Sequence, residues 1–298
     1  MPSIYQKFVL PLLALLLGAV GAILRLWQRA SYDSSGLPIP LAPSSVVLTL
    51  FLAAAAVLFL VLSLRLPKTI SSQEAVGCTG TALLLAVCAG LMLVSAVIGL
   101  MSFVTGYQEA VRSAASALLR SDALRKFFFS SILSLILSVA AIPTAVALLY
   151  RAKQTKLGQV SASGFAALMP AFYCWVWLIE AYRQHTANPI IWDYVCLLFA
   201  IVTQLVSAYY RAGFFYGVGK PRPAVFTSLL AQLFTVVAIT DCGDGATMLI
   251  LTVFLLYTLA ELFALLPLVL YQPRRLAPEP PAPDSSGHSD TQEEEPHE

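Results

Sequence analysis

The sequence predicts an all-α, polytopic integral membrane protein with about eight transmembrane helices. Of its 298 residues, 58% are hydrophobic and only 11% are charged, whereas soluble domains average about 25% charged residues. The apolar residues gather in runs of about 20, which is the length that a helix needs to cross the hydrocarbon core of a bilayer. A soluble chain this apolar would expose large hydrophobic patches, so we expect the protein to lie in a lipid bilayer.

The eight apolar runs have similar lengths and are separated by short polar connections. They cover residues 8–27, 45–64, 80–103, 128–150, 164–183, 191–210, 224–240 and 246–270. Within the first run, the uncharged stretch 8–24 follows Lys7 and superficially resembles a signal peptide, but Arg25 and Arg29 come after it without a small-residue cleavage site. We therefore predict an uncleaved first helix.

The basic residues predict the orientation. An even number of spans puts both termini on one side, and with cytoplasmic termini 11 Lys and Arg flank the inner side and seven the outer side. This bias favours cytoplasmic termini and accounts for the basic membrane region without nucleic acid. Compact loops and the lack of Asn-x-Ser/Thr acceptor sites favour a bacterial cytoplasmic membrane.

The connection at residues 151–158 divides the spans into two sets of four, residues 1–150 and 151–271. The first span of each set ends with a charged residue, Arg25 or Glu180, followed two residues later by an aromatic one. Because each set has an even number of spans, a repeat would be parallel, about an axis normal to the membrane. Two generic pairs of hairpins explain the same pattern, so both interpretations stay open.

Two segments lie outside the spans. Residues 107–122 carry apolar side chains near helical spacing, which predicts a short amphipathic helix on the outer surface or, alternatively, an extension of the third span into water. Residues 272–298 are rich in Pro, Ser and acids, and seven acids but no base follow Arg275. We expect a disordered acidic cytoplasmic tail.

Glu261 is the most prominent candidate for a functional side chain, because it lies well inside the last span. An ionised carboxylate at that depth costs at least a few kcal/mol unless it is paired or hydrated. Tyr257 and Thr258 share its helical face and could donate hydrogen bonds to it. It could bind a cation or proton, or it could be a protonated donor between helices.

Gln204 and Gln232 are the other central polar side chains. An amide in lipid needs a partner on another helix, and either one could meet Glu261. We predict them as candidate binding residues on that ground.

Tyr173, Trp177 and Glu180 share one stripe of the fifth span. The structural interpretation is an interfacial aromatic group with Glu180 in water or paired to Arg183. The functional alternatives are a wall that accepts a cation, or an ion pair between Glu180 and Arg25.

No motif indicates an enzyme, a cofactor or a metal site. The five cysteines include no C-x-x-C pair, and the glycine-rich segment 211–222 lacks the spacing of a phosphate-binding loop. The sequence therefore favours a transporter-like protein or the membrane subunit of a transport system for a small solute. The alternative is a non-catalytic membrane scaffold that recruits partners, or further copies of itself, through its tail and outer segment.

Overall fold

The structure is a computed structural model that describes residues 4–32, 42–66, 79–112, 117–157, 164–185 and 194–270. These residues form eight helices: α1 (Ile4–Ala30), α2 (Pro43–Leu64), α3 (Thr79–Arg112), α4 (Ala117–Leu157), α5 (Gly164–His185), α6 (Val195–Phe215), α7 (Pro221–Ile239) and α8 (Gly245–Leu270). All eight are long and apolar enough to cross a membrane. The predicted all-α fold of eight helices is confirmed, and their length and hydropathy are those of a multi-pass membrane protein. The acidic tail lies outside the described residues.

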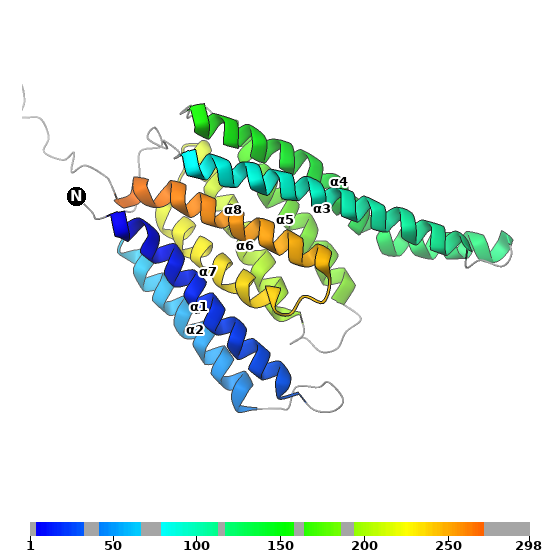
Figure 1. Cartoon of the computed structure of the whole chain (residues 1–298), viewed down its shortest axis with the longest axis horizontal. Helices are drawn as coiled ribbons and strands as arrows, with labels where there is room; N and C mark the ends of the chain where they lie inside the picture. Colours follow the sequence, from blue (N-terminus) through cyan, green and yellow to red (C-terminus); the bar gives the residue numbers. More distant parts are fainter. Residues whose placement is uncertain are drawn as a thin grey trace, which may run out of the picture.

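The helices alternate in direction, so the bundle has two faces. We call the face where α1 begins and α8 ends the proximal face, and the opposite one the distal face (Figure 1). Proline sits at the first turn of α2 and α7, where its missing N–H has no helical partner to lose. The large exposed side chains are predominantly aliphatic and aromatic, as contact with lipid requires.

Helices α7 and α8 lie at the centre of the bundle. The pair α1 and α2 packs on α7, while α3 packs on α8 and α4 packs on α5, so the two pairs lie on opposite sides of the centre (Figure 1). The boundary expected at residue 151 falls inside α4, which continues to Leu157. The described helices thus form one bundle, and the parallel repeat stays a prediction.

Helices α3 and α4 are much longer than a bilayer requires. With 34 and 41 residues they measure about 51 and 61 Å, against a hydrocarbon core of about 30 Å. They run together past the distal ends of the other helices (Figure 1). We call this projecting part the α3–α4 hairpin.

The segment 107–122 is divided between these two helices, so a separate amphipathic helix is not observed. Residues 107–112 continue α3, as in the alternative interpretation, residues 117–122 begin α4, and residues 113–116 lie outside the described part. No glycine or proline interrupts 107–122, and Phe127 packs on Phe103 and Tyr107 with ring centroids 5.2 and 6.3 Å apart. These contacts hold the two helices together beyond the bundle.

Candidate functional site

Three buried charged side chains near the proximal face, Arg151, Arg211 and Glu261, form an ion cluster that we call the proximal cluster. Glu261 is 1% exposed. Its Oε1 lies 2.5 Å from Nη2 of Arg151, and its Oε2 accepts a 2.6 Å hydrogen bond from Nε of Arg211. One carboxylate is therefore held between two buried guanidinium groups.

Three helices bring these residues together because α4, α6 and α8 all end at the proximal face. Arg151 and Arg211 lie near the ends of α4 and α6, and Glu261 lies about two and a half turns before the end of α8. The long arginine side chains pack on apolar neighbours: the guanidinium carbons of Arg151 and Arg211 lie 4.9 and 5.5 Å from the ring centroids of Phe215 and Phe214.

The sequence did not identify the two arginines as partners of Glu261. Both were counted among the cytoplasmic loop charges, although each stands at the end of an apolar run. The expected donors were wrong: Tyr257 shares the face of Glu261, but its hydroxyl lies 3.4 Å from Nη1 of Arg151, and Thr258 bonds to the carbonyl of Phe254 in its own helix. The sequence did contain a signal for these partners: a carboxylate buried as deeply as Glu261 needs a cation nearby, and both arginines stand at the ends of apolar runs.

A polar stripe runs along the interface of α6 and α7. Its members are Gln204, Ser207, Ser228, Gln232 and Thr235. Gln204 Nε2 donates a 2.8 Å hydrogen bond to Thr235 Oγ1, and the hydroxyl oxygens of Ser207 and Ser228 lie 2.7 Å apart. Because Gln204 and Ser207 share a helical face with Arg211, this α6–α7 stripe leads toward the proximal cluster.

Neither glutamine meets Glu261, contrary to our expectation. Gln204 bonds to Thr235, while both amide atoms of Gln232 and the Oε1 of Gln204 have no hydrogen-bond partner. Both side chains are fully buried. A buried amide without partners costs free energy, so the α6–α7 stripe holds hydrogen-bonding capacity that the described residues do not use.

A second ion cluster, the distal cluster, lies at the opposite face. Arg25 is 0% exposed, and its Nε lies 2.8 Å from Oδ2 of Asp241 in the turn between α7 and α8. Its Nη1 donates to Gln28 Oε1 at 2.5 Å and to the Tyr32 hydroxyl at 3.3 Å. The pair expected between Arg25 and Glu180 is therefore wrong: α1 packs on α7 and brings Arg25 to Asp241 instead.

Four free thiols lie in the described part of the bundle. Cys88, Cys174, Cys196 and Cys242 are free. Burial, together with the charges of Asp241 and Asp244, raises the pKa of Cys242 to about 11, so its thiol is protonated at neutral pH.

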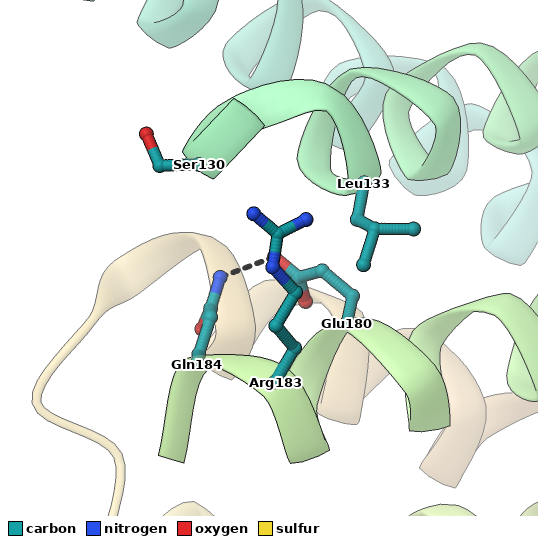
Figure 2. A pocket seen from close by; sticks show the side chains of 5 residues that line it. All are labelled: Ser130, Leu133, Glu180, Arg183 and Gln184. Atoms are coloured by element: carbon teal, nitrogen blue, oxygen red, sulfur yellow. Dashed lines mark hydrogen bonds between the residues drawn. The ribbon is translucent and has the colours of Figure 1, made fainter. Parts of the chain in front are cut away.

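The stripe of α5 divides into a packed part and a polar part. Tyr173 and Trp177 are buried and stack on Phe254 of α8, with ring centroids 5.6 and 5.9 Å away. Glu180 instead accepts a hydrogen bond from Gln184 and lines a pocket between α4 and α5 (Figure 2). The two rings therefore belong to the core between α5 and α8.

The ion pair expected between Glu180 and Arg183 is also not formed. Arg183 donates to the carbonyl oxygen of Phe129 on α4, and its guanidinium lies 5.1 Å from the Phe129 ring centroid.

No protein-family model, characterised protein or solved structure matches this chain.

Proposed function

We propose that the protein binds a small solute and moves it across a membrane, alone or as the membrane subunit of a transport system. The proximal cluster carries the proposal, because it places three charges inside apolar spans. Hydrophobic side chains of similar volume often stabilise a protein as well as a buried ion pair does. Charges kept at such a position favour a functional role over a purely structural one.

The arrangement along the bundle supports the same function. The proximal cluster joins α4, α6 and α8 at one face, the distal cluster joins α1 to the α7–α8 turn at the other, and the α6–α7 stripe lies inside the bundle. Alternating access requires contacts at each face that break in turn, with solute-binding groups near the membrane midplane. We assign these roles to the two clusters and to Gln204 and Gln232.

The protein acts in a bacterial cytoplasmic membrane, as its compact loops and lack of Asn-x-Ser/Thr acceptor sites favour. Its proximal face is toward the cytoplasm, as the distribution of basic residues favours. It acts without covalent catalysis, since the proposed roles need only charge and hydrogen bonding.

The test is solute flux through liposomes that contain the purified full-length protein. Light scattering reports uncharged solutes, and currents on solid-supported membranes report charged ones. Glu261→Asp keeps the charge but withdraws the carboxylate by one methylene from two arginines, so we expect flux to fall about tenfold or more. The matched control is Glu109→Asp at an exposed position of α3. Unchanged flux in folded Glu261→Asp protein would contradict the proposal.

A second candidate function is a membrane scaffold, which the α3–α4 hairpin favours. This hairpin projects past the distal ends of the other helices (Figure 1), so it offers a surface beyond the bundle. If the scaffold is the function, deleting residues 107–122 or the tail from residue 276 removes a co-purifying partner or the homo-oligomer. Glu261→Asp then leaves partner binding unchanged, which separates the two candidates.

A further inference from the structure

A pocket of about 220 Å³ lies between α4 and α5, and none of the residues that line it belongs to either ion cluster. Its lining comes from Ser130 and Leu133 on α4 and from Glu180, Arg183 and Gln184 on α5 (Figure 2). Gln184 is exposed at the distal end of α5, whereas Glu180 is 7% exposed. The pocket therefore opens near the end of α5 and has Glu180 in its inner wall.

An acidic and a basic side chain, Glu180 and Arg183, line this pocket without forming an ion pair with each other. Glu180 accepts its hydrogen bond from the uncharged amide of Gln184, and Arg183 donates to the backbone oxygen of Phe129. Among the described residues, no ion pair joins Glu180 or Arg183 to any charged group. Figure 2 shows the three α5 side chains converging beside Leu133, with the Ser130 hydroxyl directed away.

A buried carboxylate without a cation is costly, so its environment indicates what it would bind. A cation alone would pair with Glu180 but would be repelled by Arg183. An anion alone would pair with Arg183 but would be repelled by Glu180. A molecule with both charges satisfies both side chains through charge-assisted hydrogen bonds, and a guanidinium matches a carboxylate particularly well.

We propose that this pocket binds a small zwitterion, with its ammonium group at Glu180, its carboxylate at Arg183 and its carbon atoms against Leu133. The volume agrees with this class, since pockets for drug-sized ligands start at about 300 Å³ and this one is smaller. The site rests on α4 and α5 alone and holds whether the protein transports a solute or acts as a scaffold.

The experiment is calorimetric titration and thermal unfolding of the full-length protein in lipid nanodiscs. The probes are glycine, β-alanine and glycine betaine, with ethylammonium and acetate as singly charged comparisons at the same concentrations. We expect saturable binding and a raised Tm with at least one zwitterion and with neither singly charged probe. Glu180→Gln and Arg183→Gln should each weaken that binding about tenfold or more, since each removes a charged hydrogen-bonding partner.

Two further variants keep the test decisive if Glu180→Gln does not fold. Leu133→Trp fills the pocket while both charges remain, and we expect it to abolish binding. Arg125→Gln removes an exposed arginine of α4 and should leave binding unchanged. The proposal is overturned if no zwitterion binds saturably, if acetate or ethylammonium binds equally well, or if Leu133→Trp and Arg183→Gln bind like the parent.

Discussion

The two ion clusters differ in how their charges are balanced. Among the described residues, the contacts of buried Arg25 in the distal cluster include one carboxylate, Asp241, and the uncharged groups of Gln28 and Tyr32. In the proximal cluster, one carboxylate faces two buried arginines, which leaves a net charge of +1 among its members. Arg25 therefore has uncharged hydrogen-bond acceptors besides its carboxylate, whereas both arginines of the proximal cluster depend on the single carboxylate of Glu261.

The clusters also differ in what they connect. The distal cluster attaches one helix, α1, to a turn at the edge of the bundle. The proximal cluster joins three helices that do not follow one another in the sequence. A change in the proximal cluster is therefore expected to affect the packing of a larger part of the molecule.

Glu261→Gln should have the largest effect on stability. It leaves two guanidinium groups in the bundle without a carboxylate, and removing one partner of a buried ion pair costs about 3–5 kcal/mol. The free energy of unfolding in bicelles, measured by steric trapping, reports this loss.

The double variant Arg151→Gln, Glu261→Gln is the control for this interpretation. It restores the net charge of +1 and leaves one guanidinium in place of two, so it should recover about 1–3 kcal/mol relative to Glu261→Gln. If the double variant is less stable than Glu261→Gln, the proximal cluster is not dominated by its charge balance.

Asp241→Asn should have a smaller effect, about 2 kcal/mol. Arg25 keeps its hydrogen bonds to Gln28 and Tyr32, and the asparagine oxygen can still accept one bond. Steric trapping gives the magnitude, and hydrogen exchange of the α7–α8 turn should increase locally. A loss as large as that of Glu261→Gln would remove the difference between the clusters.

The fold was largely predictable from sequence because length and hydropathy determine whether a helix can span a bilayer. The eighth span, expected at 246–270, is observed as Gly245–Leu270. The ends of α3 and α4 were not predictable in the same way. Residues 107–122 contain no glycine or proline, so they fit either a separate surface helix or an extension of the third span. Contacts of Phe127 with α3 decide between them.

The candidate site was predictable only in part. Hydropathy predicts how deep a residue lies in the membrane, but it does not predict which helices are its neighbours. Depth alone identified Glu261 as a buried charge that needs compensation. Its partners come from helices whose packing order is set by tertiary contacts, so Arg151 and Arg211 were taken for loop residues. The same limitation led us to pair Arg25 with Glu180, although α1 packs on α7 and not on α5.

Gln232→Leu extends the comparison to the α6–α7 stripe inside the bundle. Both amide atoms of Gln232 lack hydrogen-bond partners among the residues that the structure describes, so an apolar side chain of similar size should raise the free energy of unfolding by about 1 kcal/mol. Gln204→Leu is the matched variant and should not be stabilising to that extent, because it removes the bond to Thr235. If Gln232 binds the solute, the more stable Gln232→Leu protein should lose flux.

Arg29→Gln should have the smallest effect and defines the limit of the distal cluster. Arg29 lies 3.8 Å from the same carboxylate, Asp241, that Arg25 contacts, but its side chain is 48% exposed. Water and salt screen such a pair, so we expect a loss below about 0.5 kcal/mol that shrinks as ionic strength rises. Steric trapping at low and high salt measures both quantities. A larger, salt-independent loss would show that Asp241 needs both arginines, in which case the distal cluster would have the same two-to-one charge balance as the proximal one.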